Sequence, residues 1–333
     1  MRAQAAAKIP LTVGLTLAHL WKEEEKDHDH ECLTQITSVD FRSVSFTKRC
    51  DSPRSGEVSK VSRVCRADLR FAAAYMTAFS STSLDAVGTT SFSLSEQSFD
   101  ELTRTGQTGH RYVQIEVRRK PTAHLVTTWN AVGSIRERPD PPSERKMSVI
   151  VNDRTIELPI RHVRGFLEGP HNWDTMEGKV LDDAVFPLML DYWFERIKFQ
   201  IRFVKISFPA ASALEQALET DKHVDVYGIY FDFNSDVLRP ESEPVLREIG
   251  ELLQKHGDWT LAIQGHTDNI GGDAFNLDLS NRRSAAVRKA LTERYKIEGG
   301  RLTTSGFGAS QPKAPNDTPE GRAKNRRVEL VRR

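Results

Sequence analysis

Apolar and polar residues alternate with the period of a β-strand in much of the chain between residues 41 and 209. In residues 112–118 the apolar side chains Val113, Ile115 and Val117 are separated by polar ones. Successive side chains of a strand point to opposite faces, so this pattern predicts a strand with one buried face.

Two further segments of this region carry strand patterns with an added feature. Residues 147–160 hold two apolar runs around residues 152–154, whose Asn-Asp-Arg sequence favours a hairpin turn. Along residues 198–208 the apolar positions alternate and then change phase at Val204. Either the strand is irregular at that point or both of its faces are covered. We therefore expect a β-rich domain over residues 41–209.

The pattern changes at Pro209. Residues 210–223 carry Leu214 and Leu218 at helical spacing and predict a short linker helix. Strand and helix patterns then alternate with short loops, which is typical of a mixed α/β unit over residues 224–333. The chain is therefore expected to be α+β, with a β-rich N-terminal domain followed by a smaller mixed domain.

Start and stop signals divide the C-terminal domain into elements. Residues 226–233 predict a strand that runs into a turn, and residues 259–264 predict a second strand. Ser242 is expected to cap the helix between these strands, with Gly257 at its left-handed end. Ser280 is expected to cap a second helix.

Two arginines follow this second cap directly. With Ser280 as the cap, Arg282 and Arg283 lie in the first helical turn, where a cation opposes the helix dipole. The penalty is explained if one arginine holds an anion. It is equally explained by a surface pair with Asp278.

The first 40 residues are polar, charged and poorly patterned, and we expect a polar tail or a degenerate export segment. Arg2 and Lys8 precede an uncharged run at residues 9–21. That run is too short to cross a bilayer, and no small-x-small cleavage site follows it. An export signal is therefore not clearly encoded.

Three cysteines lie near the start of the chain without a C-x-x-C pair: Cys32, Cys50 and Cys65. We expect one disulfide at most. Cys50 and Cys65 could close a short loop in an oxidising compartment, or all three thiols could stay reduced.

The sequence Asp-His-Asp-His at residues 27–30 offers carboxylate and imidazole ligands that suit zinc or nickel. Consecutive residues rarely converge on one ion without distant partners, so a solvated tail is the favoured interpretation. We expect neither a metal nor a cofactor.

Charge further narrows the classes of partner. The 333 residues include 47 basic and 46 acidic ones, which gives a net charge of +1. No global field directs such a chain towards nucleic acid or an anionic membrane. We therefore expect no nucleic-acid partner, and any electrostatic recognition must be local.

A set of spaced residues in the C-terminal domain carries a family resemblance. Its members are Phe231-Asp232-Phe233-Asn234, Gly265-His266-Thr267-Asp268, Gly271, Asn276, Leu279-Ser280, Arg283, Val287, Gly321-Arg322-Ala323 and Asn325-Arg326-Arg327-Val328-Glu329. In this order they resemble the OmpA-like C-terminal domain, which is shared with the peptidoglycan-associated lipoprotein and flagellar-motor stator proteins. The resemblance covers residues 224–333 and does not extend to the N-terminal region.

The resemblance implies a βαβαβ domain, with two helices on a mixed sheet, that binds peptidoglycan through the diaminopimelate of its stem peptide. This ligand presents an ammonium and a carboxylate on one carbon, so a carboxylate and a guanidinium can clamp it. The matching positions are Asp268 for the ammonium and Arg283 for the carboxylate. The other pocket positions implied by the resemblance are Asn234, Asn276, Leu279 and Arg326.

The same residues have simpler explanations. Asp268 and Arg283 could form an internal salt bridge, since surface ion pairs are common and seldom functional. His266 beside Asp268 could serve as a general base. The sequence offers no G-x-S-x-G nucleophile elbow and no open metal triad, so a structural histidine in a binding domain is favoured.

The N-terminal domain leaves two alternatives open. One is a cell-wall-localised hydrolase, for which the acid/base candidates are His162, His171, Asp182 and Asp183. Residues 181–184 are more simply explained as a turn between strands. The other is an interaction module for an envelope or secretion partner, with Trp173, Tyr192 and Trp193 at the interface, although such aromatics are more often core.

Taken with the resemblance, these features predict an envelope anchor without enzymatic activity. Peptidoglycan is the expected partner, together with an envelope protein bound by the N-terminal domain. Because peptidoglycan lies outside the inner membrane, the expected location is the periplasm, in association with the cell wall or the outer membrane.

Overall fold

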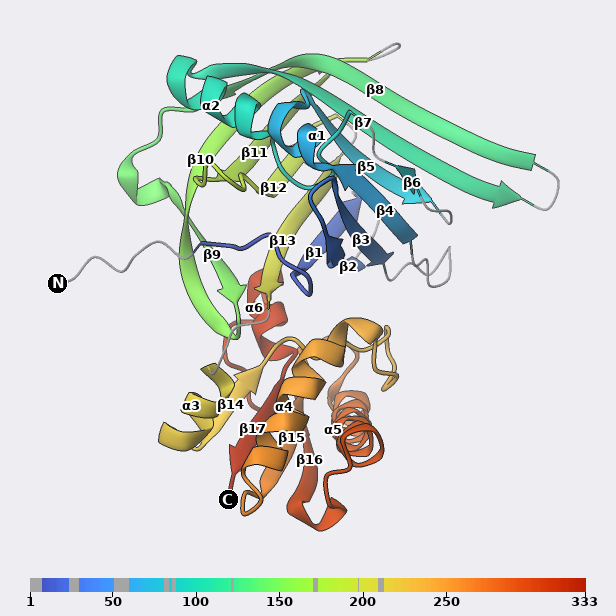
Figure 1. Cartoon of the computed structure of the whole chain (residues 1–333), viewed down its shortest axis with the longest axis vertical. Coiled ribbons are helices and arrows are strands. Elements are labelled where there is room, and N and C mark those ends of the chain that lie inside the picture. Colours follow the sequence, from blue (N-terminus) through green and yellow to red (C-terminus); the bar gives the residue numbers. More distant parts are fainter. Residues whose placement is uncertain are drawn as a thin grey trace. The chain divides into compact units, whose positions relative to one another are not determined.

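The computed structural model describes residues 8–23, 30–50, 60–80, 84–85, 88–120, 123–169, 173–196, 198–208 and 213–333. The chain divides into two compact units. The first comprises Met1–Val149 and Thr155–Phe203, and the second comprises Ile150–Arg154 and Val204–Arg333. The first is β-rich and the second is mixed, so the α+β class is confirmed (Figure 1).

The first unit is built on one large sheet. In the described residues its strand order is β5-β7-β8-β10-β11-β12-β13-β1-β2-β3-β4-β6, and β9 pairs with β10 and β13. The strands are β1 Thr16–Glu23, β2 His30–Val39, β3 Ser43–Cys50, β4 Lys60–Cys65, β5 Ala74–Ser80, β6 Leu84–Asp85, β7 Gln107–Lys120, β8 Ala123–Glu137, β9 Lys146–Val151, β10 Arg154–Glu168, β11 Trp173–Leu181, β12 Met189–Phe194 and β13 Phe199–Ser207. Its helices are α1 Arg66–Phe71 and α2 Glu96–Thr105, and α2 packs against β7 and β8.

The strands predicted in this region are confirmed. A hairpin turn separates β9 from β10, where Asn152 and Asp153 have φ of 42° and 65°. In β13 the buried positions alternate at first and become continuous from Phe203 to Ile206, so the phase change reflects burial of both faces. β7 covers residues 112–118, but the side chains of residues 113–120 lie outside the described part of the chain.

Of the two alternatives predicted for residues 1–40, the polar tail is wrong for residues 16–23 and 30–39, whereas residues 1–7 and 24–29 lie outside the described residues. β1 and β2 pair antiparallel in the large sheet, and Leu17, Leu20, Leu33 and Ile36 are buried. Every residue from Thr16 to Leu20 is buried, so this part of β1 has no solvent-exposed face. The alternation that marks a half-buried strand is therefore missing from this segment.

The disulfide joins different cysteines from those suggested by their spacing. Cys32 and Cys50 are bonded, whereas Cys65 is free and exposed. The sheet register explains the pairing, because Cys32 of β2 lies directly opposite Cys50 of β3. Such a register depends on which strands pair, and sequence separation carries no information about it.

The boundary between the units also differs from the prediction. The predicted helix is present as α3, Ala213–Thr220, but Leu214 and Leu218 are buried in the core of the second unit. The second unit includes Ile150–Arg154 and continues from Val204, where the end of β13 pairs with residues 150 and 151. α3 is therefore part of this unit rather than a linker.

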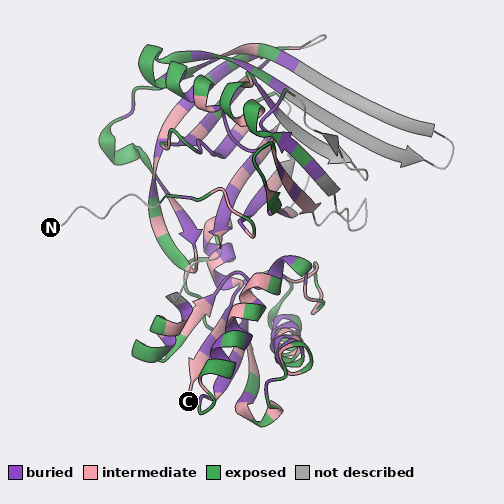
Figure 2. Cartoon of the chain, viewed as in Figure 1, coloured by how far each residue is buried: buried purple, intermediate pink, exposed green. Residues whose placement is uncertain are grey.

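The second unit has a mixed sheet with helices, as predicted. Its elements after α3 are β14 His223–Val226, α4 Glu243–Lys255, β15 Leu261–His266, α5 Asp273–Tyr295, β16 Leu302–Gly308, α6 Pro319–Asn325 and β17 Val328–Arg332. The strand order is β14-β17-β15-β16, and only β15 and β16 are parallel. α5 packs on β15 and β16, and β15 is buried along almost its whole length (Figure 2).

The strand predicted over residues 226–233 and the caps predicted for α4 differ from the structure, because side chains bond to the backbone there. β14 ends at Val226, because the Tyr227 N–H donates to Asp153 Oδ1 at 2.6 Å and the Tyr230 N–H donates to Ser242 Oγ at 2.8 Å. Ser242 precedes α4, but its hydroxyl is bonded to Tyr230 and makes no cap. His256, the residue after α4, has a φ of −108°, and Gly257 does not supply the predicted left-handed end.

α5 begins earlier than its predicted cap. It starts at Asp273, so Ser280 is buried inside the helix and its hydroxyl accepts the Gly308 N–H at 2.9 Å. Arg282 and Arg283 therefore lie in roughly the third turn, where the helix dipole has little influence. The predicted dipole penalty does not arise.

Candidate functional site

Asp268 lies just beyond the end of β15, in the loop that leads to α5. Its Oδ1 accepts the Ile270 N–H at 3.1 Å, and its carbonyl accepts Asn276 Nδ2 at 3.1 Å. The side chain is only 12% exposed. These bonds fix the direction of the carboxylate at the mouth of the loop.

Arg326 is the ion-pair partner of Asp268. Its Nη1 lies 2.9 Å from Asp268 Oδ2, and its side chain is 25% exposed. Arg326 follows α6, which Thr318 caps by accepting the Gly321 N–H at 3.0 Å. The neighbouring Asn325 accepts two backbone N–H groups of the loop before α6. Arg326 is thereby held beside the loop of Asp268.

Arg283 is held by a different part of the domain. Its Nε donates to the Ser235 carbonyl at 2.9 Å, and its guanidinium carbon lies 4.8 Å from the centre of the Phe231 ring. A cation over an aromatic face is electrostatically favourable. Asn234 belongs to the same turn, with φ of 51° and an exposed side chain.

The remaining predicted positions, Asn276 and Leu279, are buried beneath the loop of Asp268. Asn276 and Leu279 are buried in the first turns of α5, with exposures of 2% and 4%. Asn276 spans the loop, because its backbone N–H donates to Gly272 and its side chain donates to Asp268. We interpret Asn276 as a support for the carboxylate loop rather than as a group open to solvent.

The loops of the site and the first turns of α5 also expose apolar side chains that the sequence analysis did not single out. The residues concerned lie within two positions of Asn234, Asp268 or Asn276 in the sequence, and they are Phe233, Ile270, Phe275 and Leu277. An isolated large apolar residue in a polar loop was the available signal. It is weak, because single exposed apolar residues are common on protein surfaces.

His266 lies inside the domain and not in the site. Its side chain is fully buried, stacks on the Phe307 ring with centroids 5.3 Å apart, and has Nε2 3.4 Å from Glu329 Oε2. The close contact with His266, together with Lys313 and Arg327, lowers the pKa of Glu329 to about 2. Full burial agrees with the structural role predicted for this histidine.

The acid/base candidates of the first unit that the structure describes each bond to different partners. His162 Nδ1 is bonded to Asp140 Oδ2, whereas Asp182 pairs with Arg161 at 2.8 Å. Asp183 Oδ1 accepts two backbone N–H groups within the turn after β11, which confirms the predicted turn. His171 lies outside the described residues.

The predicted interface aromatics of the first unit have different environments. Tyr192 is buried and Trp193 is half-buried, so both belong mainly to the sheet. Trp173 is 53% exposed and stacks on Phe166, which is 51% exposed, with ring centroids 5.5 Å apart. An exposed aromatic pair therefore lies on β10 and β11.

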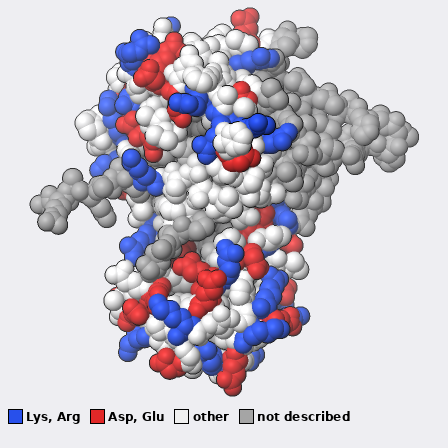
Figure 3. All heavy atoms as spheres, in the orientation of Figure 1, with Lys and Arg blue, Asp and Glu red and all other residues white. Residues whose placement is uncertain are grey.

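The surface charges are mixed. Figure 3 shows basic and acidic residues interspersed over the visible face of the described residues. Within the part of the chain that the structure describes, no helix has the length and apolar character to cross a membrane.

Comparisons with known proteins match the second unit. The sequence model of the OmpA family matches residues 230–326. Outer membrane porin F of Pseudomonas aeruginosa is 41% identical over 101 residues, which cover 30% of this chain and 29% of porin F. Peptidoglycan-binding protein ArfA of Mycobacterium tuberculosis is 39% identical over 103 residues, which cover 31% of this chain and 31% of ArfA.

A solved structure matches the same part of the chain. The cell wall anchor of the T6SS from Pseudomonas aeruginosa is 30% identical, with a TM-score of 0.30, and the match covers 35% of this chain and 91% of the anchor. The matched segment spans less than a third of each of the two curated relatives. Residues 230–326 therefore form an OmpA family domain.

Proposed function

We propose that the OmpA family domain binds peptidoglycan non-covalently and anchors an envelope protein to the cell wall. The name of the relative ArfA supports this proposal, since that protein is described as peptidoglycan-binding. The single observation that carries it is a carboxylate, Asp268, fixed at a loop mouth by Ile270 and Arg326.

We further propose diaminopimelate as the group recognised. Asp268 receives the ammonium, and Arg283 receives the carboxylate on the same carbon. Arg283 suits this role because its bond to Ser235 and its contact with Phe231 hold the planar guanidinium, which can meet a carboxylate through two parallel hydrogen bonds. Arg326 orients Asp268 and adds positive charge for a second carboxylate of the ligand.

Co-sedimentation with purified sacculi tests the proposal. Asp268→Ala and Arg283→Ala should each weaken binding at least about tenfold, because a partner of a charged hydrogen bond is lost. Arg282→Ala is the matched control, since Arg282 is next in sequence but pairs with Asp236 and Asp278. Undiminished binding of both site variants would reject the clamp.

We propose binding without turnover for the whole chain. In the first unit, His162 and Asp182 are engaged by different partners, Asp140 and Arg161, which supports this view for the described residues. Incubation of sacculi with the purified protein should release no soluble muropeptides. Their release would establish a hydrolase in the first unit.

The proposed location is the periplasm, at the cell wall or outer membrane. The ligand lies there, and the Cys32–Cys50 disulfide supports it because such bonds persist in oxidising compartments. Mass spectrometry of the cellular protein should find the disulfide intact and define the mature N-terminus.

We propose that the first unit contacts an envelope protein through Phe166 and Trp173. Exposed aromatic pairs with one face on a rigid sheet are favourable interface anchors. In-cell crosslinking from position 173 should capture a protein, and Trp173→Ser should weaken its co-purification. Val185→Ser, which removes another exposed apolar side chain, is the control.

A further inference from the structure

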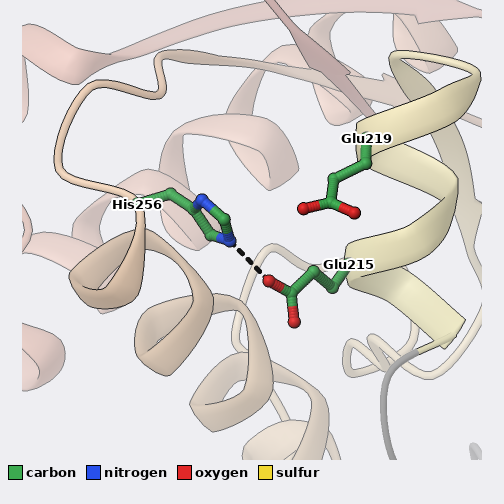
Figure 4. A group of neighbouring side chains, drawn as sticks. All are labelled: Glu215, Glu219 and His256. Atoms are coloured by element: carbon green, nitrogen blue, oxygen red, sulfur yellow. Dashed lines mark hydrogen bonds and ion pairs between the residues drawn. The ribbon is translucent and has the colours of Figure 1, made fainter.

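A group of three ligand-type side chains lies on the second unit, away from the residues of the proposed clamp. Glu215 and Glu219 belong to α3, and His256 follows the end of α4. One ligand atom from each lies within 4.8 Å of the other two. Figure 4 shows the imidazole of His256 pointing at Glu215, and Glu219 lies on the same face of α3 as Glu215. We propose that these three residues form a zinc-binding site.

Both helices hold the group in place. Residues four apart in a helix share one face, so Glu215 and Glu219 are neighbours. The rotation of α3 is fixed by Leu214 and Leu218, which are buried in the core of the unit. The two carboxylates therefore face the end of α4.

The histidine is fixed from two sides. Its ring stacks on Trp259, with centroids 3.9 Å apart and planes 17° apart. Its backbone carbonyl accepts Arg301 Nη2 at 2.6 Å. Its Nε2 thereby lies 2.5 Å from Glu215 Oε1. A ligand whose backbone and ring are both held loses little freedom when it binds an ion.

The donor set indicates the metal. Two carboxylates and one imidazole are ligands of zinc, which also accepts water at a fourth position. Calcium and magnesium prefer oxygen ligands alone, so the imidazole argues against them. The site lies at the C-terminal end of α4, where the helix dipole favours a cation.

Lys255 competes with the ion. Its Nζ lies 2.8 and 3.0 Å from the two oxygens of Glu215, but its side chain is 66% exposed. An exposed pair of this kind contributes little stability, so a divalent ion can displace the ammonium. This competition distinguishes a metal site from a plain salt-bridge cluster. Removal of Lys255 should increase the affinity of a metal site for zinc, whereas it would weaken a cluster held only by salt bridges.

Zinc titration by calorimetry tests the site on the full chain. The background carries His28→Ala and His30→Ala, so that the imidazoles of residues 27–30 cannot contribute. One zinc ion should bind this background protein. Glu219→Gln and His256→Gln should each weaken binding at least about tenfold, and Lys255→Met should strengthen it. Glu251→Gln, which removes an exposed carboxylate elsewhere on α4, should leave it unchanged.

Several outcomes would overturn the proposal. Absence of zinc binding by the background protein is one. Equal binding by the background, Glu219→Gln and Lys255→Met proteins is another, because zinc would then be bound elsewhere. Glu219 is exposed, so its substitution leaves the fold intact and the comparison valid.

Discussion

Each of the two units is stabilised internally by different interactions. In the first, apolar strands such as β1 are buried on both faces, and a disulfide joins two neighbouring strands. In the second, charged side chains link loops and strands around an apolar core, as Arg326 does with Asp268 and Arg327 with Asp225 of β14. The first arrangement gives stability, whereas the second also places charged side chains at the surface where the proposed ligand would bind. The predictions below begin with the largest expected effect.

Leu33→Ala should destabilise the first unit by about 2–5 kcal/mol, because a fully buried side chain of β2 is lost. Chemical unfolding followed by intrinsic fluorescence measures this change. Val13→Ala, at an exposed position, should have little effect. If the two substitutions have equal, small effects, residues 30–39 are a tail and not part of the core.

Cys32→Ser should cost about 3 kcal/mol, because the unfolded chain regains the freedom of a loop that closes over 18 residues. Thermal unfolding with and without reductant measures the loss. Cys65→Ser should have no comparable effect, since that thiol is free and exposed. A greater loss from Cys65→Ser would favour the Cys50–Cys65 pairing.

Glu329→Gln should make the second unit less sensitive to acid. The folded pKa of Glu329 is lowered from 4.5 to about 2, so the unfolded state binds its proton more readily. Its contribution to stability is present above pH 4.5 and is lost as the pH falls towards 2. Denaturant unfolding between pH 2 and 5 should show a flatter profile for the variant. Glu293→Gln, an exposed helix position, should keep the steeper profile.

Asp153→Asn should remove a loss of stability that occurs as the pH rises, whereas Glu329→Gln removes a loss that occurs as the pH falls. Denaturant unfolding between pH 4 and 6 should therefore show a flatter profile for the variant. Burial raises the pKa of Asp153 from 3.8 to about 6, so the folded state holds its proton more tightly. This contribution is present below pH 3.8 and is lost as the pH rises through 6. Asparagine keeps an oxygen for the Tyr227 N–H and tolerates the positive φ. An unchanged slope of stability between pH 4 and 6 would show that Asp153 does not titrate there.

The sequence predicted the second unit better than the first because spaced polar residues mark its loops. The resemblance to the OmpA-like domain, carried by those spaced residues, implied the mixed sheet and pointed to Asp268 and Arg283 as site positions. The start of α5 did not, since Ser280 resembles a cap and is used instead to bond Gly308. The contact of Arg283 with Phe231 also depends on packing between distant segments.

The first unit was less predictable for a related reason. Period-two alternation identifies strands with one solvent face, so β1 was missed because all five residues from 16 to 20 are buried. The pairing of Cys32 with Cys50 required the register between β2 and β3. Pairing between strands is a tertiary property, and no local pattern encodes it.

The most direct test of the central proposal is a titration of the full chain with free diaminopimelate, monitored by NMR. Diaminopimelate should shift the signals of Asp268 and Arg283, and Arg283→Ala should abolish the effect, whereas Arg282→Ala should not. Cadaverine, which keeps both ammonium groups but lacks both carboxylates, should bind at least about tenfold more weakly. Equal binding of both ligands, or binding unaffected by Arg283→Ala, would contradict the proposed clamp.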